Sequence, residues 1–172
     1  MALYALGDRE PRIDPMAFVH PDAIIIGDVE VGAESTIWPG AVLRGDHGVI
    51  RVGARTSIQD GAIVHCTADL ATVVGSECTV GHLAHLEGCT LEDRSLVGSG
   101  ATVLHGAVIR TGAVVAAQAL VAPGLDVPSG ALARGVPARI VHGAADPGMI
   151  DHAVVTYVRD AHWYAADLRR LD

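Results

Sequence analysis

The sequence is poor in aromatic residues and has no excess of positive charge. Only 3% of its 172 residues are aromatic although 50% are hydrophobic. We therefore expect a core of Val, Ile, Leu and Ala without large rings. The formal net charge is -8, which argues against a nucleic-acid partner because phosphate binding requires a basic surface. A chain of this length is expected to form one compact domain.

The chain also lacks long apolar runs and a disulfide framework. No run approaches the ~20 residues that span a bilayer, so we expect no membrane partner. The N-terminus has no basic region followed by an apolar stretch, the pattern of a secretory signal. The three cysteines, Cys66, Cys78 and Cys89, have no disulfide-framework spacing. A reduced, cytoplasmic setting is the simplest interpretation.

Aliphatic residues recur every six positions, and small residues often stand four places later. A period of six fits neither a helix nor a simple strand. It predicts a hexapeptide β-helix, in which three hexapeptides form one coil of a triangular prism and parallel strands of neighbouring coils pair. An ordinary β-sandwich is the alternative. The phased aliphatic positions are Val31, Ile37, Leu43, Val52, Ile58, Val64, Val74, Val80, Leu86, Leu91, Val97, Val103, Ile109, Val115, Val121 and Val127.

Breaks in this period predict the remaining organisation. Extra residues in 44–51 and after His65 should form loops, where functional residues are often found. Residues 1–24 are expected to form a starting strand and a cap, and residues 25–138 the β-helix. A helix is expected over 146–170, with Asp146 as N-cap and Pro147 at its first position. Its apolar face should lie along the outside of the prism.

Ligand-type side chains concentrate in one segment, Val-Gly-His-Leu-Ala-His-Leu-Glu-Gly-Cys, at residues 80–89. Imidazole and carboxylate groups bind zinc and similar divalent metals. His65 and Glu87 directly follow two inward positions one coil apart, so they should stack on one edge of the prism. His82 follows a different face and should lie at another edge. Three prisms side by side would join these groups, so the lattice predicts a homotrimer with sites at its interfaces.

The hexapeptide lattice and several motifs together resemble the gamma-class carbonic anhydrases. The motifs are Arg44-Gly45-Asp46, Ser57-Ile58-Gln59-Asp60, His65, Gly81-His82 and Gly88-Cys89. The resemblance implies a left-handed parallel β-helix, a homotrimer, and a zinc ion at each subunit interface. The implied activity is attack of a metal-bound hydroxide on CO2 or another small electrophile. Iron, cobalt or nickel are alternative metals.

Within this resemblance, His65 and His82 match two metal ligands. The third ligand is normally a histidine, and its position is Glu87 here. His85 is a possible alternative ligand. Two histidines and a glutamate are a known catalytic zinc set with an open position for water. A carboxylate leaves less positive charge on the metal, which predicts weak activity near neutral pH.

The resemblance also assigns supporting roles around the metal. Gln59 matches the residue that orients the hydroxide, and Asp60 matches its neighbour. Ser57 stands where the family usually has Asn. Arg44 and Asp46 match an interface ion pair. His47 occupies the position of a proton-shuttle carboxylate that some members carry.

Two other functions remain open from the sequence. The first is a hexapeptide acyltransferase that uses acyl-coenzyme A, since that class shares the lattice. Its need for a long loop over the pantetheine arm argues against it here. The second is a catalytically inactive trimeric scaffold, in which Glu87 would pair with an arginine across the interface and no metal would bind.

Overall fold

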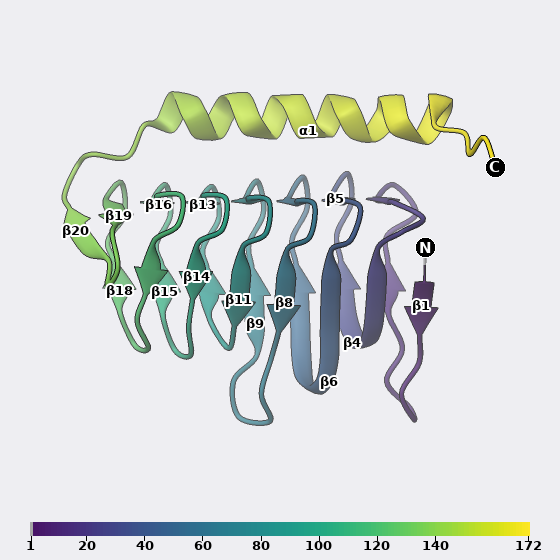
Figure 1. The fold of residues 1–172 in the computed structure, drawn as a ribbon, viewed down its shortest axis with the longest axis horizontal. Coiled ribbons are helices and arrows are strands. Elements are labelled where there is room, and N and C mark those ends of the chain that lie inside the picture. Colours follow the sequence, from purple (N-terminus) through teal and green to yellow (C-terminus); the bar gives the residue numbers. More distant parts are fainter. Residues whose placement is uncertain (1) are drawn as a thin grey trace.

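The computed structural model describes residues 2–172, which coil into a parallel β-helix with one helix, α1, alongside (Figure 1). Strands of consecutive coils pair in a 12-stranded and an 8-stranded sheet. The larger sheet bends at β4 and β6 to form two faces of the prism, and the smaller sheet forms the third. These pairings are parallel except β19 with β20. The predicted parallel β-helix is confirmed.

The three faces are numbered in the order in which the chain visits them after β5. Face 1 contains β1 (Ala2–Tyr4), the first parts of β4 (Ile24–Val31) and β6 (Val42–Val52), β8 (Ile63–His65), β11 (His85–Glu87), β14 (Thr102–Val103) and β17 (Leu120–Val121). Face 2 contains β2 (Arg12–Ile13), the second parts of β4 and β6, β9 (Thr72–Val74), β12 (Thr90–Leu91), β15 (Val108–Ile109) and β18 (Asp126–Val127). Face 3 contains β3 (Phe18–Val19), β5 (Thr36–Ile37), β7 (Ser57–Ile58), β10 (Thr79–Val80), β13 (Leu96–Val97), β16 (Val114–Val115), β19 (Leu132–Arg134) and β20 (Arg139–Val141).

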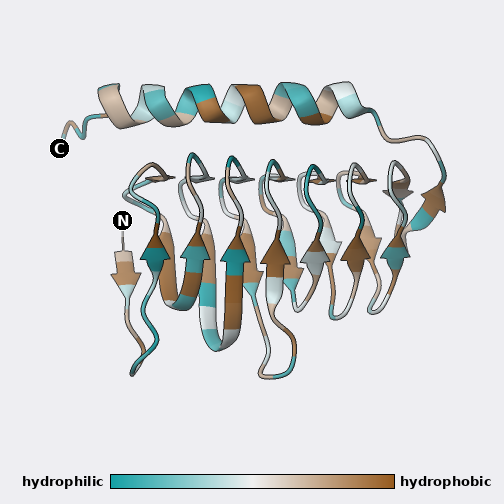
Figure 2. Ribbon diagram, turned by 180° about the vertical axis from the view of Figure 1, so that it is seen from behind, coloured by the Kyte–Doolittle hydropathy of each residue, from teal (hydrophilic) through white to brown (hydrophobic). Residues whose placement is uncertain are grey.

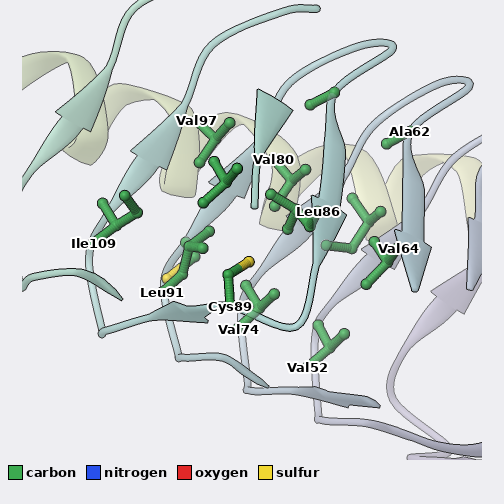
Figure 3. Close-up of a cluster of buried hydrophobic side chains, with 14 of the residues drawn as sticks. Val52, Ala62, Val64, Val74, Val80, Leu86, Cys89, Leu91, Val97 and Ile109 are labelled. Carbon is green, nitrogen blue, oxygen red and sulfur yellow. The ribbon is translucent and has the colours of Figure 1, made fainter. Parts of the chain in front are cut away.

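The phased aliphatic residues fill the interior of the prism, as the six-residue period predicted. Each is at most 3% exposed. In register, Leu43 pairs with Val64, and Val64 with Leu86. Figure 3 shows side chains from all three faces pointing into one interior, and Figure 2 shows hydrophobic residues recurring from coil to coil. Burying one such side chain contributes about 1.5–3 kcal/mol, so the repeat itself is the main source of stability.

The coils turn where the predicted small residues stand, and extra residues leave the prism at the junction of faces 1 and 2. Ala62, Ala84 and Ala101 are fully buried at corners. The residues between β8 and β9 form a loop that extends below the prism in Figure 1. The extra residues before Arg51 do not interrupt β6, which continues round the corner as one strand. Both sets of extra residues therefore enlarge the same edge of the prism, where face 1 meets face 2.

Helix α1 (Pro147–Asp167) covers face 3 and runs back along the prism, so both termini lie at the same end (Figure 1). The side chain of Asp146 caps it by accepting from the Gly148 amide at 2.9 Å, as predicted. Its end at Asp167 comes slightly before the predicted limit. Among residues 2–172, no helix is long and apolar enough to cross a membrane.

Aromatic side chains fix α1 at the N-terminal end of face 3. The rings of Trp38 and Tyr164 meet edge to face, with centroids 4.9 Å apart, and Tyr157 packs on Trp38 at 6.0 Å. Phe18 contacts Tyr164 at 5.8 Å. Phe18, Trp38, Tyr157 and Tyr164 thus attach the helix outside the prism core.

Candidate functional site

The candidate residues fall on two edges of the prism. Edge 1–2, where the chain passes from face 1 to face 2, carries His65 and Glu87 at the ends of β8 and β11. Edge 3–1, where it passes from face 3 to face 1, carries His82 in the turn between β10 and β11. This is the arrangement that the lattice predicted for these three residues.

On edge 1–2, His65 lies between two carboxylates. Its Nδ1 is 2.9 Å from Oε1 of Glu87, and its Nε2 is 3.0 Å from Oδ1 of Asp46. His85 and His105 approach the other oxygen of Glu87, with Nε2 at 3.5 and 3.7 Å from Oε2. The edge therefore holds an alternating cluster of imidazoles and carboxylates.

Close backbone packing places these side chains. Gly45 separates Arg44 from Asp46, and a Cβ on it would lie 2.4 Å from the carbonyl oxygen of Asp28. Only glycine fits this contact, so the chain turns the corner here and Asp46 reaches His65. The hydroxyl of Thr72 donates to the carbonyl oxygen of His65 and holds the other side of the same corner.

The electrostatics of edge 1–2 favour ionised carboxylates. Partial burial opposes ionisation of Asp46, but hydrogen bonds from His65 and Arg44 outweigh it and lower its pKa to about 2. The guanidinium of Arg44 donates to Asp46 within the same chain. The hydrogen bond from His65 is the main cause that lowers the pKa of Glu87. Both groups are therefore anionic at neutral pH.

On edge 3–1, His82 and Asp60 form a second, more exposed pair. Nδ1 of His82 lies 2.9 Å from Oδ2 of Asp60, and each side chain is 50% exposed. Gln59 precedes Asp60 and is buried beside a groove that His82 also lines. Tyr157 of α1 lines this groove, and its burial raises the pKa of the phenol.

Ser57 is not brought to either edge. It lies on face 3 beneath the aromatic residues, where the indole of Trp38 donates to its Oγ at 3.0 Å and Thr36 Oγ1 lies 2.9 Å away. The residue is only 2% exposed. Its hydroxyl thus belongs to a buried network that anchors Trp38.

Face 1 separates the two edges and has no helix on it. Its outward side chains next to edge 3–1 form a largely apolar row in which Ile63 is 38% exposed. In residues 2–172 of one chain, no group of three His, Cys, Asp or Glu residues is arranged to hold a metal ion. The row, in register from coil to coil, is Ile24, Val42, Ile63, His85, Thr102 and Leu120.

The sequence interpretation missed two contacts at edge 1–2. It assigned no role to His105, although His105 approaches Glu87. It also did not pair Asp46 with His65. The six-residue period could have indicated the contact of His105, because His105 follows the inward residue Val103 of face 1 by two positions and so lies at edge 1–2. The period gave no signal for Asp46, because the path of the extra residues between Arg44 and Arg51 lies outside the repeat.

Comparison with known proteins agrees with this architecture. A family model described as "Bacterial transferase hexapeptide (six repeats)" matches residues 10–45. The chain is 41% identical over 168 residues to gamma carbonic anhydrase 1, mitochondrial, of Arabidopsis thaliana, covering 93% of this chain and 61% of that protein. It thus spans about 60% of the length of the Arabidopsis relatives it matches.

Two bacterial proteins match over more of their own length. The carnitine operon protein CaiE of Escherichia coli strain K12 is 43% identical over 146 residues, or 85% of this chain and 74% of that protein. The crystal structure of a hexapeptide transferase family protein from Anaplasma phagocytophilum has a TM-score of 0.91 and 36% identity, covering 95% of this chain and 98% of that one.

Proposed function

Because the chain belongs to the hexapeptide-repeat family and is homologous to gamma carbonic anhydrases, we propose that it is a trimeric metalloenzyme with carbonic-anhydrase-like activity. One observation carries the proposal: an imidazole and a carboxylate stand together at each edge of face 1, His65 with Glu87 on edge 1–2 and His82 with Asp60 on edge 3–1. The proposed substrate is CO2 or a similar small electrophile. Each site would be shared between two subunits.

The donor groups on edge 1–2 suit a zinc ion or a similar divalent ion. His65 and Glu87 present an imidazole nitrogen and a carboxylate oxygen 2.9 Å apart. Asp46 holds the other nitrogen of His65. A carboxylate behind a metal-bound histidine fixes the ring orientation and raises ligand basicity. If His65 and Glu87 bind one ion, the nitrogen that faces Glu87 is the one available.

The third ligand would come from a neighbouring subunit that contacts this one through face 1. If three copies turn face 1 toward a common axis, edge 3–1 of each copy meets edge 1–2 of the next. Such a head-to-tail contact closes into a ring. His82 of one subunit then approaches His65 and Glu87 of its neighbour. The exposed apolar side chains of face 1 would be buried in the same step.

The remaining residues have roles that follow from their positions. A bound divalent ion supplies a water nucleophile at moderate pH by lowering the pKa of that water. Gln59 presents an amide beside His82 to orient the reacting molecules, and Asp60 fixes His82 by its 2.9 Å contact. Arg44 balances the charge of Asp46. His47 is exposed next to Asp46 and can exchange protons with solvent.

Metal analysis of the purified protein tests the proposal. We expect about one zinc or similar ion per subunit, and measurable CO2 hydration. His82→Ala should remove most of this metal while the far-UV circular dichroism stays unchanged, because His82 is an exposed turn residue outside the core. His142→Ala changes another exposed histidine far from both edges and should keep the metal. Protein that is metal-free after growth with zinc and gentle purification would contradict the function.

An acyltransferase is the second candidate, because the matching family is described as a transferase and the Anaplasma relative is named a hexapeptide transferase. Such an enzyme needs a base and room for the pantetheine arm of coenzyme A. The insertion between β8 and β9 is short and spans only residues 66–71. Binding of coenzyme A by calorimetry, with no bound metal, would favour the transferase.

A further inference from the structure

Leu83 is an exposed leucine in an unusual backbone conformation. It follows His82 in the turn at edge 3–1, and it is 72% exposed. Its φ of 58° lies in the left-handed region, which costs free energy for a residue that has a side chain. The exposed leucine also leaves apolar surface in water. Such a residue points to a function when the fold itself does not require its side chain.

The same turn in other coils shows that the fold does not require a leucine here. Leu83 lies against Gly61, on which a Cβ would be 2.6 Å from Cδ2 of Leu83, and Gln118 lies against Gly100 in the same way. The corner therefore accepts a small or a polar residue, and Leu83 is the apolar member of this set. The equivalent positions in four other coils, all with positive φ, are Gly40, Gly61, Gly100 and Gln118.

Edge 1–2 carries an exposed leucine at the same level of the prism. Leu70, in the loop between β8 and β9, is 37% exposed. A Cβ on Gly88 would lie 3.0 Å from Cβ of Leu70, so Leu70 lies directly over the residue that follows Glu87. The amide of Leu70 donates to Oγ1 of Thr67 at 3.1 Å, which holds the loop in this position. Leu83 precedes β11 and Gly88 follows it, so the two leucines stand on one coil at opposite edges of face 1.

We propose that Leu83 of one subunit packs against Leu70 of the next and so fixes the position of His82 in the shared site. The inference rests on the proposed function, in which edge 3–1 of one subunit meets edge 1–2 of its neighbour. When each copy turns face 1 toward a common axis, residues of the same coil meet at one level. The partner of Leu83 is therefore a second copy of this chain. Burial of both leucines offsets the local cost of the left-handed turn.

This contact matters for the metal because His82 is weakly held by its own chain. Its side chain is 50% exposed, and within the chain it is held by Asp60, at 2.9 Å. A metal ligand binds well only when the residues around it restrain its position. Leu83 is the next residue along the turn, so its contact with the neighbouring subunit restrains His82 from that side. Leu83 is thus a positioning residue that acts through His82.

Crosslinking tests the contact directly. The double variant Leu70→Cys/Leu83→Cys, treated as the intact protein with o-phenylenedimaleimide, should give dimers and trimers that persist in denaturing electrophoresis, and nothing larger. Within one chain the two positions lie at opposite edges of face 1, so the crosslink must join two subunits. The native cysteines are at most 1% exposed and should not react. Leu70→Cys/Gln118→Cys is the matched control and should crosslink much less, since Gln118 lies two coils, or about 10 Å, further along the same edge.

Leu83→Gly provides an independent measurement, because glycine accepts the left-handed conformation and the subunit should fold at least as well. The subunit concentration at which the assembly dissociates should rise about tenfold or more, as expected for the loss of a buried leucine side chain. While the variant is still assembled, its zinc should pass to a chelator faster than that of the parent. Leu83→Met keeps the volume and apolar character and should restore both properties. Gln118→Gly relieves the same kind of turn on the same edge and should change neither.

The outcomes separate this inference from the proposed function. An assembled, metal-containing double variant that crosslinks no more than its matched control overturns the inference alone. So does a Leu83→Gly protein that dissociates and releases zinc no more readily than Gln118→Gly. Crosslinked trimers of a protein whose parent contains no metal contradict the function and support the contact.

Discussion

At the scale of single residues, we expect Glu87 to limit the chemistry of edge 1–2 most. The resemblance drawn from the sequence implies a ligand histidine at this position, and in the structure Glu87 is the shared partner of His65, His85 and His105. These contacts hold the carboxylate ionised, as its lowered pKa indicates. An anionic ligand leaves a divalent ion with less positive charge than a neutral imidazole does. A water molecule bound to that ion is then harder to ionise.

Glu87→His should therefore increase CO2 hydration at pH 7. With three histidines, the pKa of the bound water should approach ~7. Each unit by which this pKa falls raises the ionised fraction at neutral pH by up to about tenfold. Stopped-flow CO2 hydration of both proteins across pH 6–10 measures the change, with the parent gaining activity only toward alkaline pH.

The comparison requires equal metal content in the two proteins. Glu87→Gln serves as the control, since it removes the charge of the carboxylate without supplying an imidazole, and it should bind less metal. If Glu87→His is fully loaded with zinc and no faster than the parent, Glu87 does not limit the chemistry. The departures at Ser57 and His47 would then be the next residues to change.

At the scale of elements, α1 matters because it builds one wall of the groove on edge 3–1. Three kinds of contact attach it: the aromatic cluster around Trp38, the apolar cluster with Ile150 and Val154, and ion pairs at the remaining edge. Arg94 links Asp151 of α1 to Glu77 of the prism. The first turn of α1 carries no acidic side chain, so the Asp146 cap is its main local stabilisation.

Asp146→Ala should destabilise the protein by about 1 kcal/mol, within the range of 0.5–2 kcal/mol for losing an N-cap side chain. The amide of Gly148 would lose its acceptor at 2.9 Å. Chemical denaturation at fixed protein concentration measures the loss. Asp167→Ala, at the exposed last residue of the helix, is the control and should change the free energy of unfolding by less than about 0.5 kcal/mol. Equal effects of the two substitutions would show that the cap is unimportant.

The strands and the helix also show which features of the structure can be predicted from the sequence. Burial of the interior residues, such as Val64 and Leu86, was predictable because one inward side chain per six residues is a local rule. The helix start was predictable because Asp146 and Pro147 are local signals. The Asp46 contact with His65 was not, since it depends on how a non-repeating corner folds back. The hydroxyl of Ser57 accepts a hydrogen bond from Trp38. Trp38 packs under α1, and the six-residue period gives no information about that packing.

At the scale of the whole molecule, the proposed site exists only if copies of the chain meet through face 1. His65 and His82 lie at opposite edges of face 1, so the proposed ligand set needs residues from two chains. The same face presents Ile63 and Ile24, which are 38% and 36% exposed. Assembly and metal binding should therefore be lost together.

Ile63→Arg tests this coupling, because it places a charge in the middle of the apolar row of face 1. We expect sedimentation to change from about three times the 17.8 kDa subunit mass toward one subunit. The metal content should fall in parallel, although neither His65 nor His82 is altered. Val73→Arg is the matched control: Val73 is a partly exposed outward residue of face 2, next to Arg51 and Thr90. It should leave both the mass and the metal unchanged. A monomeric Ile63→Arg protein that keeps its full metal content would place all the ligands within one chain and contradict the shared site.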